Sequence, residues 1–464
     1  MRILLVEPDF PYPSKSKNQA NKIHKNFVPV GLLKLGAYHN KLGHKVKLVR
    51  GNVSIRELGS FKPSMIFVTS IFTYWSKYVW DTIEHYRTLF PEAKIIIGGI
   101  YATLHSDRKY FREKLSYYNA KCHVGLHSEA EEYYPDYTLL NGQIDHHVTH
   151  AMRGCIRKCS FCGVWKIEPK RTYKTSEDLI EEIKEVGKNK VIFFDNNFLA
   201  NENIKEILSD LSKLRVNNRP VRFECQSGFD GRLLEGNPEL ATLLKKANFH
   251  SVRIAWDNSL RDFQSVKKQL DYLGTAGYKP KDIFVFMVYN YEIPYEKMLK
   301  KLEYCKKWGV QIADCRYRPL DSLKDDYNPG KYRTGQTDED YYIHTKSGWT
   351  DHKIRDFRKR VRQHNIWVRY AKDKGLEYDK RMEKWSGIHT TFKYFHMGRP
   401  PQLEIMEKSP TWKRRLEMMN RVKNYYRKHS LNSLNFSSFS KSRIDDTLSG
   451  ILDEIEGTKT TAPG

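Results

Sequence analysis

Cysteine is scarce in this chain, with 7 residues in 464, and three of the seven fall within eight positions. A secreted scaffold held by disulfides carries more cysteines, in an even number. No apolar stretch approaches the roughly 20 residues that a membrane helix needs. The apolar start, Met1–Val6, is too short for a signal peptide. We therefore expect a cytoplasmic protein with no membrane partner.

Acidic residues are also under-represented, with 55 Asp and Glu against 80 Lys and Arg, which gives a formal charge of +25. The basic excess continues through residues 351–430, where 22 Lys and Arg face 9 Asp and Glu. This balance favours a polyanionic partner such as nucleic acid. A solvated, lysine-rich surface is the alternative, because net charge alone is a weak indication of a partner.

The N-terminal 140 residues alternate between strand and helix patterns. Helical spacing is expected over residues 31–42 and 80–90, and the strands expected around them are Ile3–Glu7, Lys45–Arg50, Met65–Ser70, Lys94–Ile97 and His123–Gly125. Strands separated by helices of this length predict an α/β fold with a doubly wound parallel sheet over residues 1–140. Ligands of such sheets bind at the carboxyl ends of the strands.

Residues 145–325 continue the same rhythm with six more strand patterns, His147–Met152, Val191–Phe194, Val221–Gln226, Ser251–Trp256, Ile283–Tyr289 and Val310–Cys315. Helices are expected over residues 176–186, 238–246 and 295–308. Six strand–helix units in series predict a partial α/β barrel. Beyond it we expect a basic, mostly helical region over residues 326–430 and a flexible tail over 431–464.

The clustered cysteines follow the first strand of this barrel, in the segment Arg153-Gly-Cys-Ile-Arg-Lys-Cys-Ser-Phe-Cys162. The carboxyl end of a barrel strand is where barrel enzymes keep their chemistry. The thiolates of Cys155, Cys159 and Cys162 can each hold one iron of a cubane cluster and leave the fourth iron open for catalysis.

Zinc is the main alternative for these cysteines, and a chance grouping is the other. Zinc in structural sites takes four ligands, commonly from two separated pairs. His146, His147 and His150 lie upstream, but they fall in or before a strand, where successive side chains face opposite ways. No second pair at the usual spacing completes a zinc site.

The spacing Cys-x-x-x-Cys-x-x-Cys, with the aromatic Phe161 before the last cysteine, resembles the motif of the radical S-adenosylmethionine (SAM) superfamily. The resemblance implies a 4Fe–4S cluster on Cys155, Cys159 and Cys162, with Phe161 at the cofactor site. It implies that the open iron chelates SAM and that reduction of the sulfonium gives a 5′-deoxyadenosyl radical. An electron donor such as flavodoxin or ferredoxin would then be a partner.

Four further positions are candidates for binding SAM. Asp195 and Asn197 end the second barrel strand, where this superfamily contacts the SAM amino group, although an Asx turn that caps the strand is the alternative. Glu224 lies on the polar face of the third strand, which we expect to point into the barrel. By the same alternation Asp257 points inward after the fourth strand, as a candidate for the ribose hydroxyls.

The N-terminal region resembles the cobalamin-binding domain that precedes the barrel in one branch of the superfamily. The resembling segments are Gly31–Gly36, Leu42–Val46, Ile97–Thr103 and Pro135–Tyr137. If cobalamin binds, Ser70, Gly98 and Gly99 would line its site. The Asp-x-His-x-x-Gly signature of a cobalt-ligating histidine is absent, and ordinary strand-end turns also explain the glycines.

These patterns predict a radical SAM enzyme, and the catalytic residues after radical formation are not evident from the sequence. With cobalamin, the enzyme would be a transferase that methylates an unactivated carbon. Without cobalamin, it would abstract hydrogen and then rearrange or cyclise its substrate. An iron–sulfur protein that binds or modifies nucleic acid is the alternative that the basic charge favours.

Overall fold

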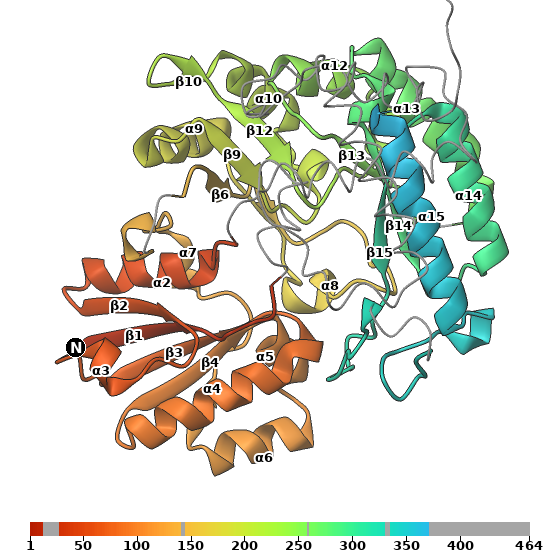
Figure 1. The fold of residues 1–464 in the computed structure, drawn as a ribbon. Coiled ribbons are helices and arrows are strands. Elements are labelled where there is room, and N and C mark those ends of the chain that lie inside the picture. Colours follow the sequence, from red (N-terminus) through yellow and green to blue (C-terminus); the bar gives the residue numbers. More distant parts are fainter. Residues whose placement is uncertain (13–26, 141–143, 258, 330–334, 371–464) are drawn as a thin grey trace, which may run out of the picture. The chain divides into compact units, whose positions relative to one another are not determined.

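The computed structural model describes residues 1–12, 27–140, 144–257, 259–329 and 335–370 (Figure 1). The chain divides into two compact units, residues 1–304 with 313–356 and residues 305–312 with 357–464. The expected basic region is described only as far as helix α15 (Asp351–Tyr370), and the expected tail lies outside the described residues. Within the described ranges, every helix falls short of the length and apolar character that crossing a membrane requires.

A five-stranded parallel sheet forms the N-terminal part of the first unit, with strand order β2-β1-β3-β4-β5. Its strands are β1 (Arg2–Glu7), β2 (Lys45–Arg50), β3 (Met65–Ser70), β4 (Lys94–Gly99) and β5 (Ala120–Cys122). The doubly wound sheet expected from the sequence is therefore present. Its order reverses between β1 and β3, which makes the crevice at their carboxyl ends the usual place for a ligand.

Helices cover both faces of this sheet because alternate strand residues are apolar on each side (Figure 1). On one face Ile3 and Leu5 pack with Leu32 of α2 (Val30–Lys41). On the other face Leu4 and Val6 belong to a larger core. That core includes residues of α4 (Ser76–Leu89), α5 (Ile100–His105) and α6 (Lys109–Tyr117). The short helices α3 (Ile55–Leu58) and α7 (Ser128–Glu131) complete the region.

The last strand of this sheet differs from the prediction. Strand β5 runs from Ala120 to Cys122, three residues before the expected His123–Gly125. Its register pairs Ala120 with Ile95 and Cys122 with Ile97. Asn119, with a φ of 47°, turns the chain from α6 directly into this register. A short edge strand is therefore placed by pairing with β4, not by its own apolar pattern.

The six strands predicted for the barrel are all present. They form two three-stranded sheets, β12-β9-β6 and β13-β14-β15. Their bounds are β6 (His147–Thr149), β9 (Lys190–Phe193), β12 (Arg222–Cys225), β13 (Arg253–Ala255), β14 (Phe284–Tyr289) and β15 (Gln311–Arg316). Parallel bridges of Phe223 with Phe249 and of Phe229 with Ile254 continue the pairing between the two sheets. The strands thus follow chain order, as in a partial barrel.

The barrel helices are α9 (Ser176–Val186), α10 (Ile204–Lys213), α11 (Arg232–Gly236), α12 (Glu239–Lys246), α13 (Phe263–Thr275) and α14 (Tyr295–Trp308). Helix α9 shows why its bounds were predictable. Thr175 and Asp178 form a capping box at its start, and Gly187 ends it with a φ of +72°.

In the second unit, residues of α15 bond to the chain just before and within β15. The ring of His364 hydrogen bonds through Nε2 to the carbonyl of Val310, at 2.7 Å. Asn365 accepts the N–H of Ile312 through Oδ1 and donates to its carbonyl through Nδ2, both at 2.7 Å. This side chain satisfies the strand backbone as a neighbouring strand would.

The buried carboxylate of Glu182, in α9, links this helix to strand β6. Glu182 accepts hydrogen bonds from His147 (3.0 Å), Thr149 (2.8 Å) and Lys174 (2.6 Å). Burial alone would raise the pKa of Glu182, but the hydrogen bond from His147 and the charge of Lys174 lower it to about 2. The ionised form is therefore the one that the fold stabilises.

We predict that Glu182→Gln lowers the free energy of unfolding by about 3 kcal/mol, because the buried partners lose their anion. The pKa in the folded state lies below the ordinary value of 4.5. The wild-type advantage should therefore be full above that pH and fade as the pH falls towards 2. Denaturant unfolding across this pH range measures both effects. The exposed neighbour in Glu181→Gln is the control, and equal losses in the two variants would contradict the prediction.

Candidate functional site

A loop between β6 and α8 (Val164–Ile167) carries the three clustered thiols, Cys155, Cys159 and Cys162. Its base is closed by antiparallel pairing of β7 (Met152–Arg153) with β8 (Thr172–Tyr173). Gly154 begins the loop with a φ of +72°, and a Cβ there would lie 2.7 Å from the carbonyl oxygen of Lys170. Glycine is thus required where the chain leaves the strand for the loop.

Two carboxylates hold the base of this loop. Asp195, which follows β9, is fully buried and accepts the N–H groups of Ala151 (3.0 Å) and Met152 (2.7 Å). Burial raises the pKa of Asp195 to about 7, against the effect of these hydrogen bonds. Glu168 accepts the N–H of Gly154 at 2.9 Å. Asp195 thus positions the backbone at the base of the loop, and its contact with a cofactor stays a prediction.

The three thiols lie in one electrostatic neighbourhood. Burial raises the pKa of Cys159 and of Cys162, and charges on the other cysteines of the loop act in the same direction on both. The sulfur of Cys155 accepts hydrogen bonds from the N–H of Arg157 at 3.3 Å and from Nδ2 of Asn197 at 3.7 Å. Such donors stabilise a thiolate, which is the form that binds metal.

The arrangement of the thiols bears on the kind of metal site that this loop could form. In the part of the chain that the structure describes, no three His, Cys, Asp or Glu side chains converge on a point that could hold one ion. A structural zinc site needs four ligands that converge in this way. Cysteines of a cubane bind different iron atoms, so they need to share one loop without meeting at one point.

A second carboxylate, Asp230, organises the polar groups beside Cys155. It bonds to Arg157 at 2.8 Å and to Arg232 at 2.6 Å, and it accepts a longer bond of 3.5 Å from Nδ2 of Asn197. No described residue offers a hydrogen bond to the buried Oδ1 of Asn197. That oxygen is therefore a buried acceptor whose hydrogen-bonding capacity the described residues leave unused.

Asp230, Arg157 and Arg232 were not among the residues predicted from the sequence. Asp230 follows the third barrel strand, at its carboxyl end, within Gly228-Phe-Asp-Gly-Arg232. Gly228 has a φ of +81°. A carboxylate between two glycines at a strand end could have been identified as a turn into the site. Arg232 lies two residues further along the same segment, whereas Arg157 comes from the cysteine loop, and its pairing with Asp230 could not have been identified from the sequence.

The other residues predicted to bind the cofactor, Glu224, Asp257 and Phe161, differ in their burial and in their partners. Glu224 is buried and paired with Arg253. Asp257 follows β13 and accepts the N–H of Val288 at 2.9 Å. Burial raises the pKa of Asp257 to about 6, and its charge acts in turn on Cys159. Phe161 packs edge to face with Tyr291, at 6.0 Å between ring centroids.

The residues predicted to line a cobalamin site serve the sheet itself. The Ser70 hydroxyl donates to the carbonyl of Gly98 at 2.7 Å and accepts the N–H of Ala102 at 3.0 Å. A Cβ at Gly99 would lie 2.1 Å from the carbonyl oxygen of Ser70. Close approach of β3 and β4 explains these residues without a cofactor.

Aromatic side chains occupy the crevice where the strand order reverses. Phe10, which follows β1, stacks on Trp75 at 5.5 Å, and Phe72, which follows β3, meets Trp75 edge to face at 5.1 Å. The segment after β15 is tied to the same edge, because the carbonyl of Leu320 bonds to His105 at 2.9 Å. The residues present at this edge therefore do not fit a corrinoid.

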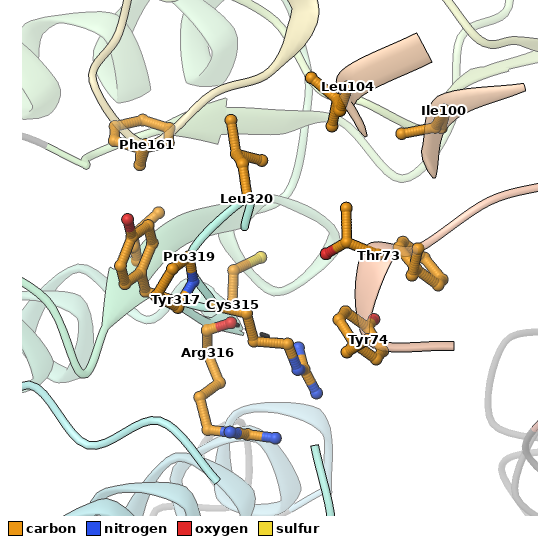
Figure 2. Close-up of a pocket in the computed structure, with 13 residues that line it drawn as sticks. Thr73, Tyr74, Ile100, Leu104, Phe161, Cys315, Arg316, Tyr317, Pro319 and Leu320 are labelled. Atoms are coloured by element: carbon orange, nitrogen blue, oxygen red, sulfur yellow. Dashed lines mark hydrogen bonds between the residues drawn. The ribbon is translucent and has the colours of Figure 1, made fainter. Parts of the chain in front are cut away.

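A cavity of about 260 Å³, which we call the junction cavity, lies between this edge and the cysteine loop (Figure 2). It is smaller than the roughly 300–1,000 Å³ of pockets for drug-sized ligands. Its lining combines Phe161 of the cysteine loop, Val288 of β14, residues after β3, residues of α5 and the segment Cys315–Leu320. Phe161 is thus a wall shared by the thiol loop and the junction cavity.

Residues 150–312 match the family model of the radical SAM superfamily. The match begins just before the cysteine loop and ends within β15, so it covers the strands that surround the thiols. These residues form a radical SAM superfamily domain, and such a domain indicates an enzyme. The family implies a 4Fe–4S cluster, SAM and an electron donor.

Comparisons with individual proteins extend less far. No curated protein matches the sequence. Among solved structures, one similar chain is from the crystal structure of Streptococcus suis SuiB bound to precursor peptide SuiA. Its identity is 15% and its TM-score is 0.30, over 41% of this chain and 44% of that chain. The chain thus spans less than half the length of this structural relative.

We predict that Glu168→Gln accelerates hydrogen exchange at the Gly154 amide by at least about tenfold, because a charged acceptor is worth about 1.5 kcal/mol or more. Exchange measured by mass spectrometry on the folded protein tests this expectation. Glu177→Gln, at an exposed position of α9, is the matched control. If Gly154 exchanges at the wild-type rate in both variants, Glu168 does not hold the loop.

Proposed function

We propose that the loop of Cys155, Cys159 and Cys162 holds a 4Fe–4S cluster and that the protein uses it with SAM to begin radical reactions without cobalamin. One observation carries this proposal. The three free thiols share one loop at the carboxyl end of β6, and polar groups that follow β9, β12 and β13 surround that loop. The radical SAM superfamily match over residues 150–312 supports the same assignment.

When bound, the cluster supplies the electron that converts SAM into methionine and a 5′-deoxyadenosyl radical. The protein's own part is to hold the thiolates and orient the substrate. The N–H of Arg157 and Nδ2 of Asn197 donate to the sulfur of Cys155 and offset its negative charge. Asp230 keeps Arg157 and Arg232 in place through its two ion pairs.

Two of the predicted contacts keep a role towards SAM in this proposal. The free Oδ1 of Asn197 would accept a hydrogen bond from the SAM amino group, since its Nδ2 is already engaged. Asp257 would accept from the ribose hydroxyls with the oxygen that does not bond to Val288. Asp195 and Glu224 act instead through the backbone of β7 and through Arg253.

The geometry favours hydrogen abstraction over cobalamin-dependent methylation. The rings of Phe10, Phe72 and Trp75 pack together after β1 and β3, and the segment after β15 is bonded to α5 at the same edge of the sheet. A corrinoid at this edge would have to displace the buried Phe10 from Trp75 and break the bond between Leu320 and His105. The reaction after hydrogen abstraction would therefore be a rearrangement, a cyclisation or a cross-link, with electrons from flavodoxin or ferredoxin.

Anaerobic reconstitution tests the cluster. The wild-type protein should take up about four irons and four sulfides per chain and release 5′-deoxyadenosine from SAM on reduction. Cys155→Ala, Cys159→Ala and Cys162→Ala should each lose the iron and the product, because each removes one ligand. Cys122→Ala, a half-buried cysteine of the N-terminal sheet, is the control. One zinc per wild-type chain with no SAM cleavage would overturn the proposal.

Cobalamin independence has a separate test. After incubation with hydroxocobalamin and gel filtration, the reconstituted protein should carry no corrinoid absorbance, and its yield of 5′-deoxyadenosine should not change. Phe10→Ala with Trp75→Ala should be needed before any corrinoid is retained. Stoichiometric corrinoid on the wild-type chain would restore the methylation hypothesis.

A further inference from the structure

The junction cavity is built by two parts of the chain that are fixed to each other. On one side the Nε2–H of His105, in α5, donates to the carbonyl of Leu320 at 2.9 Å. Tyr110 bonds to the other ring nitrogen of His105 and so holds the tautomer that can donate. Ser76, in α4, adds a bond of 3.4 Å to the carbonyl of Leu323. The cavity therefore has a defined shape before any ligand binds.

Most of the cavity lining is apolar. Phe72, Ile100, Leu104, Phe161, Val288 and Leu320 form the greater part of the walls. Figure 2 shows Leu104, Phe161 and Leu320 around one end of the space, with the Thr73 hydroxyl and the Cys315 sulfur pointing into it. A ligand that displaces water from such walls needs an apolar or aromatic body.

The charged side chains that line the cavity are both arginines, Arg316 and Arg318. Arg318 lines the cavity, and its ring neighbour Tyr74 lies 4.5 Å from the guanidinium carbon. Arg316 and Arg318 share one carboxylate, that of Asp325. Arg316 is buried and takes both oxygens of Asp325, whereas the side chain of Arg318 keeps 31% of its surface exposed. The two arginines and Asp325 together therefore carry one net positive charge.

The thiol in the cavity adds no opposing charge. Cys315 is exposed towards the cavity, and protein atoms surround its side chain closely. Burial by these atoms raises the pKa of the thiol to about 12. Asp257, whose charge also acts on Cys315, already accepts the N–H of Val288. The cavity thus has apolar walls, two neutral polar groups and one available guanidinium.

We propose that the junction cavity binds the reacting part of the substrate, and that this part is a compact carboxylic acid with an apolar or aromatic body. Its carboxylate pairs with Arg318, because a guanidinium that retains free N–H groups binds a carboxylate in its own plane. Its body lies against Phe161 and Leu320 and so against the thiol loop. This assignment rests on the proposed radical function, and it gives the N-terminal sheet a role as one wall of the substrate site.

The cavity's size limits the substrate. A volume of about 260 Å³ admits one aromatic ring with a short acid chain, but not a nucleotide polymer or a corrinoid. A larger substrate would have to present such a group at an end or on a side chain. The excess charge and the apolar walls together favour an acid over an amine or a sugar.

The test uses 3-phenylpropionate as the probe and 3-phenylpropanamide as its uncharged analogue. Saturation-transfer NMR with the reconstituted holoprotein, saturated with SAM, measures the affinity of each. The acid should bind about tenfold more tightly than the amide, the effect of one charge-assisted hydrogen bond. Arg318→Gln should remove this preference while Asp325 keeps Arg316 as its partner. Leu104→Trp should abolish binding of both probes by filling the cavity.

Lys324→Gln, at an exposed position beside this segment, is the control and should bind both probes as the wild type does. Thermal unfolding of each variant identifies loss of fold. Equal affinity for acid and amide, or displacement of the acid by SAM, would overturn the inference. Iron content and SAM cleavage of the wild-type chain, measured beside the titration, separate the two proposals. Acid selectivity in a wild-type chain that takes up no iron and cleaves no SAM would leave the binding site standing and refute the radical function. SAM cleavage without acid selectivity would do the reverse.

Discussion

The position of the thiol loop depends on the carboxylate of Asp195. A carboxylate removed from water costs several kcal/mol unless its lone pairs accept hydrogen bonds. Two successive backbone N–H groups, those of Ala151 and Met152, supply these bonds. Neither residue can move without leaving a buried polar group unpaired. The direction in which the chain leaves β6 is therefore fixed by a side chain that follows β9. The same bonds fix where the thiol loop begins.

A row of ion pairs connects the base of the thiol loop to the N-terminal sheet. Arg153 bonds to Glu168 at 3.1 Å and to Glu131 at 2.8 Å, and Glu131 bonds in turn to the buried Lys34 of α2 at 2.9 Å. Each of these partly buried charges lies against an opposite one, which is the condition for keeping ions out of water. The sheet and the radical SAM domain are thus joined at the base of the site and, through His105 and Leu320, at its mouth.

The N-terminal sheet shows how one architecture can serve different functions. Its strand order places a ligand crevice between β1 and β3, where related architectures hold a cofactor. In this chain Phe10 stacks on Trp75 beside the end of β1, and the segment after β15 is bonded to α5 at the same edge of the sheet. What remains is the small junction cavity, one wall of which is Phe161 of the thiol loop. In the proposed function, this edge of the sheet faces the substrate and not a corrinoid.

Much of the architecture could be predicted because strand and helix periodicity are local properties. The capping box at Thr175 and Asp178, the six barrel strands and the spacing of the three cysteines are all written in short stretches of sequence. Helices α10, α11 and α13 of the barrel were not identified. Strand β5 was placed three residues too late, because its position follows from pairing with β4.

The partners of each site residue could not be predicted in the same way. Asp195 and Asn197 are two residues apart, yet one is used by the backbone of β7 while the other keeps an oxygen free beside Cys155. Asp230 gains its function only where β12 brings it to Arg157 of the thiol loop. Periodicity tells which way a side chain points, but hydrogen bonds form between strands far apart in the chain. Whether a polar side chain bonds to the backbone or remains available to a ligand is therefore decided only by the tertiary structure, when the sheets pack together.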